Sequence, residues 1–412
     1  MSKLYGNAIV GQSGGPTAAI NATLVGVING CETANKEGYI NKLYGMRNGI
    51  EGFLNETVTD LSVYFGKDEL SALALTPAAA LGSCRRKMKS YTDDKATYDK
   101  LLALFKKYDI RYFFYIGGND SMDTVLKLSE YAALSGYDMR VVGVPKTIDN
   151  DLTATDHTPG FGSAAKFVAT TVKEILRDVD VYTVKAVTIV EVMGRDAGWL
   201  TASSALPLAS GGVGPDLVYL PEVAFDTEEF LSSVRAALDK HPAVLVCASE
   251  GIRFADGSYV AASGAAADGF GHVQLSGVGK VLEALVKEKI GCKVRSIELS
   301  LPQRCAAHIA SLTDIEESKG VGAYGVKLAT TDNKTAVMAT INREPGEYRA
   351  TYGYADIKSI ANEVRGVPRN YINESGNGIT PEAFDYLLPL IRGEVSPEYE
   401  NGMPKHFVFP AN

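Results

Sequence analysis

The segment at residues 145–151 (PKTIDND) combines side chains that could move a proton and hold a phosphate. Asp149 and Asp151 flank an asparagine, and Lys146 lies just upstream. One carboxylate could act as a general base with the other as its electrostatic partner, while the lysine would neutralise an incoming phosphate. A loop cap needs only one Asx residue, so the combination favours chemistry. A solvated polar loop is the alternative.

Two glycine-rich turns have the composition of an anion site, and each leads from an expected strand into an expected helix. They are residues 11–17 (GQSGGPT) and residues 117–121 (GGNDS). Glycine lets the backbone approach an anion closely, and the unpaired N–H groups at a helix N-terminus can then bind it. The same residues also suit a plain tight connection, with Asp120 or Ser121 as the helix N-cap.

Other charged side chains follow further expected strands. Arg195 lies in the turn at residues 193–195 (MGR), where a guanidinium could bind a phosphate with two parallel hydrogen bonds. Glu250 ends another strand and could accept hydrogen bonds from sugar hydroxyls. Residues 83–89 (SCRRKMK) form the densest basic stretch of the chain. The alternatives are a surface ion pair for Arg195, an exposed Glu250 and a solvated helix face at 83–89.

Short apolar runs alternate with longer helix-like segments, which predicts an α/β fold with mostly parallel sheets. In such sheets, ligands bind outside the carboxyl ends of the strands, so the turns described above can share one site. The strand count predicts two sheets, with a change of domain after Asp151. The expected strands are residues 7–10, 111–116, 140–144, 186–192, 243–247 and 294–300, with another within 335–340.

Composition narrows the functional classes. The chain has 412 residues, which favours two or three domains, and a formal net charge of −8. An acidic chain is a poor general binder of nucleic acid or of anionic membranes, so we expect neither partner. The five scattered cysteines indicate free thiols in a reducing compartment. With no basic-apolar leader at the start and no long apolar run, we expect a cytoplasmic protein.

Two other patterns carry less weight. Residues 160–165 (GFGSAA) match the dinucleotide fingerprint, but they follow a polar loop instead of a strand, so a nicotinamide-dependent dehydrogenase is a weak alternative. The histidines have no metal-ligand spacing, so we expect each to be structural. They are His157, His241, His272, His308 and His406.

Taken together, these segments resemble the phosphofructokinase family over most of the chain. The matching segments, in chain order, are GQSGGPTAAIN, GSCRRK, IGGNDS, PKTIDND, EVMGRDAG, ASEG and LPQR. The resemblance implies two Rossmann-like three-layer domains with the active site in the cleft between them. Residues 1–160 would form the phosphoryl-donor domain, to which 303–345 returns. Residues 161–302 would form the sugar-phosphate domain, with 346–412 as its C-terminal extension.

The resemblance also implies a reaction, which is Mg²⁺-dependent phosphoryl transfer to the C1 hydroxyl of fructose 6-phosphate. Asp149 would accept the hydroxyl proton with support from Asp151, and Lys146, Asp120 and Arg195 would complete the catalytic group. The implied sugar-phosphate contacts are Thr147, Ile148, Asp149, Met193, Gly194, Arg195, Glu250, Leu301 and Arg304. The implied donor contacts are Gly14, Arg85, Gly118, Asn119, Asp120 and Lys146. Arg295 matches an arginine that reaches the 6-phosphate across a subunit boundary, which implies a homodimer or homotetramer.

Two positions indicate the phosphoryl donor. Members that use ATP typically have glycine where Asp120 and Lys146 stand, and this pair is similar to the diphosphate-dependent branch. A carboxylate about 4 Å from an α-phosphate would be repelled by about 4 kcal/mol at an effective dielectric constant near 20. We therefore predict inorganic diphosphate as the donor. An ATP-dependent kinase and a catalytically silent regulatory subunit are the alternatives, and the intact acid–base loop disfavours the second.

The chain departs from the pattern of ATP-using members at two further positions. Asn119 replaces an aspartate that helps to hold Mg²⁺, although an amide oxygen or a bridging water can serve the same purpose. Leu301 replaces a histidine three positions before Arg304, so the sugar contacts in that segment can differ. Sedoheptulose 7-phosphate stays open as an additional acceptor.

Overall fold

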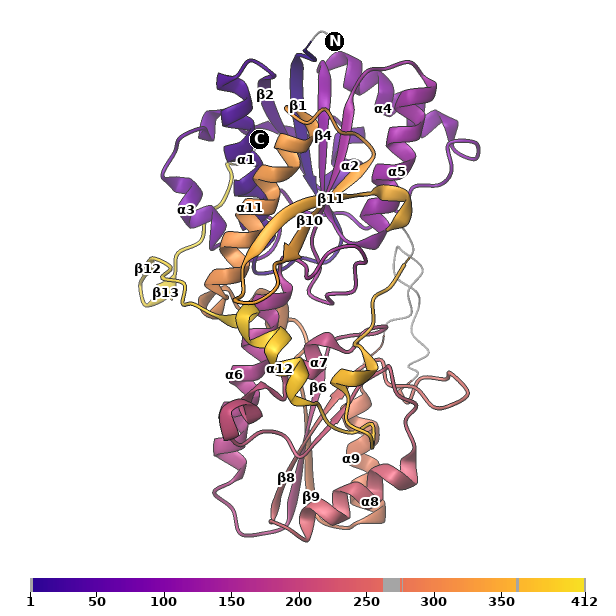
Figure 1. Ribbon diagram of the computed structural model, residues 1–412, viewed down its shortest axis with the longest axis vertical. Coiled ribbons are helices and arrows are strands. Elements are labelled where there is room, and N and C mark those ends of the chain that lie inside the picture. Colours follow the sequence, from indigo (N-terminus) through magenta and orange to yellow (C-terminus); the bar gives the residue numbers. More distant parts are fainter. Residues whose placement is uncertain (1–2, 262–274, 276, 361–362, 411–412) are drawn as a thin grey trace.

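The computed structural model describes residues 3–261, 275, 277–360 and 363–410. Within these residues the chain forms two lobes, each built on its own sheet, with one lobe above the other in Figure 1. His272 lies outside the described residues. None of the helices formed by the described residues has both the length and the apolar character needed to cross a bilayer.

The first lobe contains a seven-stranded sheet whose inner strands are parallel. Antiparallel pairs occur at its two edges, between β11 and β10 and between β2 and β3. In spatial order the strands are β11 (Ala350–Asp356), β10 (Val337–Arg343), β5 (Arg140–Pro145), β4 (Ile110–Gly117), β1 (Gly6–Gln12), β2 (Ile40–Met46) and β3 (Val58–Asp60). The inner strands are buried on both sides and are therefore almost entirely apolar, as in RYFFYI at residues 111–116.

Helices cover both faces of this sheet. On one face, α1 (Ile20–Lys36) packs against α11 (Leu312–Ala329), and both contribute to a core with the strands. The other face is covered by α2 (Gly49–Leu54), α4 (Lys95–Lys107) and α5 (Asn119–Leu134). A shorter helix, α3 (Glu69–Ala74), packs beside α1. This arrangement is a three-layer α/β lobe.

The second lobe contains four strands, all parallel. They are β7 (Leu217–Tyr219), β8 (Ala243–Ser249), β6 (Ala186–Val192) and β9 (Lys293–Glu298), in that spatial order. On one face, α6 (Phe161–Val179), α7 (Trp199–Ser203) and α12 (Pro381–Leu387) form a core with the sheet. On the other face lie α8 (Thr227–Leu238) and α9 (Val278–Lys289). The prediction of an α/β fold with two mostly parallel sheets is confirmed.

The sequence predicts residues 346–412 as an extension of the second lobe, and the structure divides this range between the lobes. α12 packs on the second sheet, whereas β11 pairs antiparallel with β10 at the edge of the first sheet. A short connection after β10 makes the next strand its neighbour, so the segment that returns to the first lobe continues past residue 345. The end of the chain also returns there, because Phe407 and Phe409 pack on Tyr64 after the small β12 (Tyr399–Glu400) and β13 (Met403–Pro404) hairpin.

The glycines at residues 160–165 have a structural role in the start of α6. Gly160 caps the helix with a φ of +100°, which is in the left-handed region. The carboxylate of Asp314 accepts hydrogen bonds from the N–H groups of Gly160 and Ser163, both 2.9 Å long. A protein carboxylate therefore already occupies the position that a dinucleotide phosphate would take.

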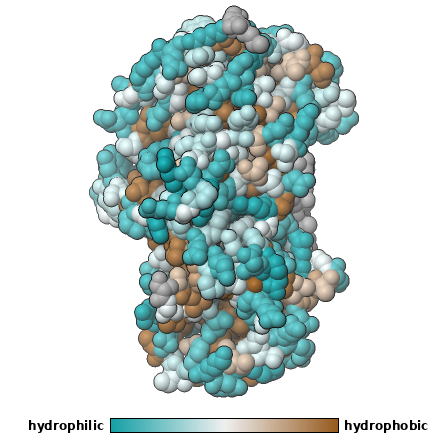
Figure 2. Space-filling model, in the orientation of Figure 1, coloured by the Kyte–Doolittle hydropathy of each residue, from teal (hydrophilic) through white to brown (hydrophobic). Residues whose placement is uncertain are grey.

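The surface in the orientation of Figure 1 is mainly hydrophilic, with brown apolar residues scattered over both lobes (Figure 2). All five cysteines lie in the described part of the chain as free thiols. His157 is buried, and its ring contacts the carboxylates of Asp156 and Glu317 at 2.8 and 2.6 Å. These contacts agree with the structural role expected for this histidine.

Candidate active site

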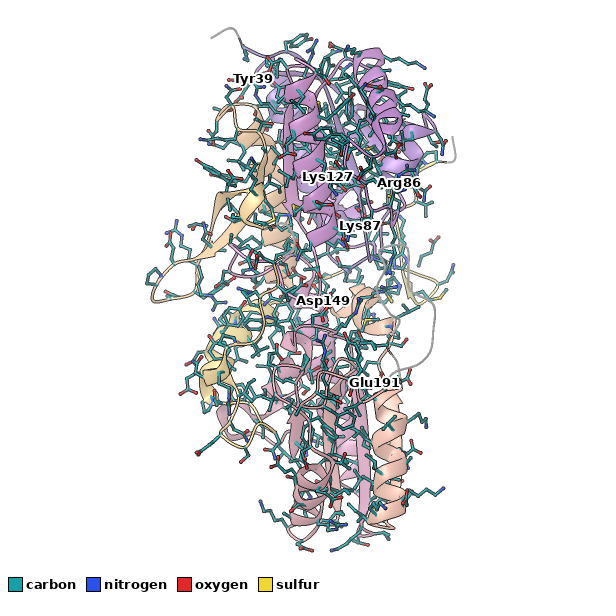
Figure 3. The ribbon with its side chains drawn as sticks, turned by 90° about the vertical axis from the view of Figure 1, so that its right-hand side faces the viewer. Tyr39, Arg86, Lys87, Lys127, Asp149 and Glu191 are labelled. Atoms are coloured by element: carbon teal, nitrogen blue, oxygen red, sulfur yellow. The ribbon has the colours of Figure 1, made fainter. Side chains whose placement is uncertain are left out.

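A cavity of about 190 Å³ lies between the two lobes, at the carboxyl ends of strands from both sheets. Figure 3 places Asp149 at this junction, with Lys87 above it on the first lobe. The cavity is lined by Gly15, Pro16, Thr17, Arg85, Lys146, Thr147, Ile148, Asp149, Met193, Arg195, Glu250 and Arg304. The turns at residues 11–17, 145–151 and 193–195 therefore meet at one site.

The loop that follows β5 carries the two aspartates, and its own residues hold its shape. The hydroxyl of Thr158 donates to the carbonyl of Thr147 at 2.7 Å. The Thr147 hydroxyl in turn lies 3.3 Å from the Asp149 carboxylate. Asn150, between the aspartates, is fully buried and has a φ of +55°, a conformation that asparagine tolerates better than most residues. This sharp turn of the backbone fixes the directions of the side chains on either side of it.

Both aspartates have pKa values above the usual range. Burial is the main cause at Asp149, opposed by the Thr147 hydroxyl and by the cations of Arg195 and Lys146. Burial and then repulsion from Asp149 raise the pKa of Asp151 to about 7. A buried carboxyl group whose pKa is raised suits general base chemistry at physiological pH.

The lysine at the end of β5 lies beneath the first glycine-rich turn. Lys146 is 3% exposed, and its ammonium donates to the carbonyl of Gly15 at 2.6 Å. Gly14 has a φ of +77°, and a Cβ on it would lie 3.4 Å from the Lys146 Nζ. Burial lowers the pKa of Lys146 to about 8; nearby Arg304 and Arg85 act in the same direction, while Asp149 opposes it. The ammonium thus fills the floor of this turn and adds positive charge to it.

The second glycine-rich turn lies behind Lys146 and does not line the cavity. Its Gly117 carbonyl accepts a hydrogen bond from the backbone N–H of Lys146 at 3.0 Å, so the two turns are adjacent. Asp120, in the first turn of α5, lies 3.8 Å from the ammonium of Lys87. The Asn119 amide donates to the carbonyl of Glu363 at 2.5 Å. The Asp120 carboxylate and the Asn119 amide therefore lie in the turn behind Lys146, outside the cavity wall.

The side of the cavity formed by the second lobe combines one arginine with one carboxylate. The Gly194 N–H donates to the carboxylate of Glu250 at 3.3 Å, and Gly194 has a φ of +138°, which favours glycine. Burial raises the pKa of Glu250 to about 7. The backbone N–H of Met193 donates to the side chain of Gln303 at 3.1 Å. These contacts fix the turn that presents Arg195 to the cavity.

Some sequence-predicted residues lie outside this cavity. Asp151 and Gly118 lie beside lining residues, but neither contributes to the wall. Arg295 is on β9, at the edge of the second sheet, and lines a separate pocket with Tyr182 and Lys293. Leu301 is 53% exposed. The roles of Arg295 across a subunit boundary and of Leu301 in sugar binding stay predictions.

Sequence reasoning missed four residues that shape the site. Gly15, Pro16 and Thr17 line the cavity, although only Gly14 was chosen from their turn. Gln303 is 2% exposed and holds the Met193 backbone, although only its neighbours in LPQR were chosen. The signal was present for each of them, because all four lie inside motifs that were recognised.

Comparison with known proteins places the chain in a family. The family model described as phosphofructokinase matches residues 7–321. The chain belongs to the phosphofructokinase family. Relatives named pyrophosphate–fructose 6-phosphate 1-phosphotransferase include those of Halomonas elongata and Xanthomonas campestris. They are 42% and 44% identical to this phosphofructokinase chain, and each alignment covers 97% of this chain and 95% of the relative.

A solved structure gives the same result at the level of the fold. The crystal structure of pyrophosphate-dependent phosphofructokinase from Marinobacter aquaeolei matches with a TM-score of 0.86 and 39% sequence identity. The match covers 97% of this phosphofructokinase and 95% of that chain. The two-lobed architecture is therefore that of the family.

Proposed function

We propose that this phosphofructokinase transfers a phosphoryl group reversibly from inorganic diphosphate to the C1 hydroxyl of fructose 6-phosphate. The products are fructose 1,6-bisphosphate and phosphate. The observation that carries the donor assignment is the ammonium of Lys146, which is buried under the Gly14-Gly15 turn and bonded to the Gly15 carbonyl. The relatives named as pyrophosphate-dependent enzymes support the same donor.

In the proposed reaction, Asp149 takes the proton from the C1 hydroxyl as that oxygen forms its bond to the transferred phosphorus. The bond between the bridging oxygen of diphosphate and the same phosphorus breaks, and phosphate leaves. Negative charge spreads over the transferred group as this occurs. Arg195 and Lys146 line the cavity beside Asp149 and stabilise that charge. Asp151, whose pKa is raised by burial and by the charge of Asp149, is the electrostatic partner of this base.

Donor binding rests on the cations of the first lobe. Arg85 and Lys146 line the same cavity and would hold the diphosphate oxygens. The described residues contain no group of three or more His, Cys, Asp or Glu side chains that could hold a metal ion. Mg²⁺ keeps several waters in most sites, so we expect it to be bound mainly through phosphate oxygens and water, with Asn119 as its protein contact. When bound, Mg²⁺ neutralises charge on the donor.

Sugar binding is assigned to the second lobe. Glu250 would accept hydrogen bonds from sugar hydroxyls, while Arg195 and the Met193-Gly194 turn would contact the sugar phosphate. Arg295 lies at a sheet edge of the single chain, which supports its contribution to a second subunit's site in a homodimer or homotetramer. We place this enzyme in the cytoplasm.

Product analysis by ³¹P NMR tests the proposal. The purified chain is incubated with fructose 6-phosphate, diphosphate and Mg²⁺. We expect stoichiometric loss of diphosphate with the appearance of phosphate and of a new C1 phosphate ester, and the reverse change from fructose 1,6-bisphosphate and phosphate. Absence of turnover that is restored by an added partner chain would instead indicate a regulatory subunit.

A further inference from the structure

Residues 363–367 of the C-terminal region, here called the strap, connect the donor turn to the second lobe. At one end of the strap, the carbonyl of Glu363 accepts the amide of Asn119 at 2.5 Å. At the other end, the backbone N–H of Val367 donates to the carboxylate of Glu222 at 2.8 Å. The strap therefore contacts both sides of the cleft.

Arg365, in the middle of the strap, binds the backbone of the loop that carries the two aspartates. Its guanidinium donates to the carbonyls of Asn150 at 3.0 Å, Thr155 at 3.0 Å and Asp156 at 2.5 Å. Its own backbone N–H donates to the carbonyl of Asp151 at 2.8 Å. One residue thus holds four backbone carbonyls of this loop, which a planar guanidinium with several fixed donors can do.

The hydrogen bond to the Asn150 carbonyl holds the residue that lies between the two aspartates. Asn150 has the left-handed φ that separates the directions of Asp149 and Asp151. Its side-chain amide donates to the hydroxyl of Tyr386 at 3.0 Å, and that hydroxyl also lies 3.3 Å from the Arg365 guanidinium. A backbone conformation of this kind persists only when its surroundings hold it. Arg365 and Tyr386 supply that constraint from outside the loop.

We propose that Arg365 is a positioning residue that holds the Asp149–Asp151 loop in its reactive shape. The guanidinium is itself fixed, because its Cζ lies 4.8 Å from the centroid of the Trp199 ring and the indole N–H donates to the Arg365 carbonyl at 2.9 Å. The inference rests on the proposed function, since it concerns the alignment of the proposed base. Lysine at position 365 would keep the positive charge but lose the planar guanidinium, whose fork of N–H groups donates to several carbonyls at once.

The chain offers a matched control for this test. Arg369 lies four positions further along, and its guanidinium donates to three backbone carbonyls of its own turn. They are those of Ile372 at 2.8 Å, Asn373 at 2.9 Å and Glu374 at 3.1 Å. Arg369→Lys therefore removes the same kind of fork from the same C-terminal region without contacting the loop that carries Asp149.

The experiment compares kcat and both KM values of the parent protein, Arg365→Lys and Arg369→Lys with diphosphate and fructose 6-phosphate. We expect Arg365→Lys to lower kcat about 30-fold, because a small displacement of a reacting group is costly, with each KM within about threefold. Arg369→Lys should keep kcat within about twofold. A kcat for Arg365→Lys within about threefold of the parent, or an equal loss in Arg369→Lys, would overturn the inference.

Tyr386→Phe keeps the test decisive if Arg365→Lys does not fold. It removes only the hydroxyl that contacts Asn150, Arg365 and the carbonyl of Asp156, and we expect kcat to fall about fivefold with unchanged KM values. Parent-like kcat in Tyr386→Phe would then overturn the inference. A parent protein without diphosphate-dependent turnover would instead contradict the proposed function, so the two failures are distinguishable.

Discussion

The two sides of the cleft use burial in opposite ways. On the donor side burial acts on a cation, and the pKa of Lys146 falls to about 8. On the sugar side it acts on an anion, and the pKa of Glu250 rises to about 7. The donor side must bind a highly charged ion, so it gathers Lys146 and Arg85, whereas the sugar side has neutral hydroxyls as well as a phosphate to bind and combines Glu250 with Arg195. Each side thus has the charged groups that suit the ligand we assign to it.

The largest effect should come from the carboxyl between the two sides. Asp149→Asn removes the proposed base without removing bulk, and we expect kcat to fall by about a thousandfold. Both KM values should change by less than about threefold, because the asparagine side chain can still hydrogen-bond to the C1 hydroxyl. Steady-state kinetics with both substrates varied measures this split. Retention of more than a tenth of the parent kcat would contradict the assignment of Asp149 as the base.

A change on the donor side should affect one substrate only. Lys146→Met removes a charge-assisted hydrogen bond to the donor, and we expect kcat/KM for diphosphate to fall about 100-fold. The KM for fructose 6-phosphate should stay within about threefold. Lys107→Met is the control, because Lys107 lies outside the cavity wall and its half-exposed side chain pairs with Glu56. Equal losses for both substrates in Lys146→Met would remove the distinction between the two sides.

The converse substitution lies on the sugar side. Glu250→Gln replaces an acceptor by an amide of the same shape, and we expect the KM for fructose 6-phosphate to rise about tenfold. The KM for diphosphate should be unchanged within about twofold. Initial rates at saturating diphosphate measure the first value, and initial rates at saturating sugar measure the second. A larger rise for diphosphate than for the sugar would reverse the assignment.

The pH profiles should also distinguish the two sides, with smaller effects near neutrality. The proposed base Asp149 acts as a carboxylate, and burial raises its pKa, so kcat/KM in the forward direction should decline on the acid side as Asp149 is protonated, by about tenfold per pH unit below that pKa. Lys146 loses its charge above pH 8, so kcat/KM for diphosphate should also decline on the alkaline side. Lys146→Arg keeps its charge there, and its alkaline limb should move to higher pH. An unchanged alkaline limb in Lys146→Arg would show that Lys146 does not set it.

Local patterns were sufficient to predict most of the cavity wall. Lys146, Arg195 and Glu250 each follow a buried apolar run, and parallel strands bring such positions together at one sheet edge. The resemblance to a family then assigned their roles. The residue types at strand ends are therefore informative, because a parallel sheet brings these positions together at one edge.

Contacts between distant segments could not be predicted in the same way. Arg365 binds the carbonyl of Asn150 across 215 positions of sequence, and nothing in its own neighbourhood marks it. The pairing of β11 with β10 was also missed, because an edge strand with partly exposed residues lacks the apolar run of an inner strand. Such contacts depend on how distant segments pack against each other, which neither composition nor periodicity predicts.

The central claim is that Lys146 and Asp120 make this active site one for diphosphate. The most direct test is the ratio of kcat/KM for diphosphate to kcat/KM for ATP, measured with fructose 6-phosphate and Mg²⁺ at the same pH. Repulsion of about 4 kcal/mol at the α-phosphate predicts a ratio of about a thousand. A ratio near one, or a preference for ATP, would contradict the account.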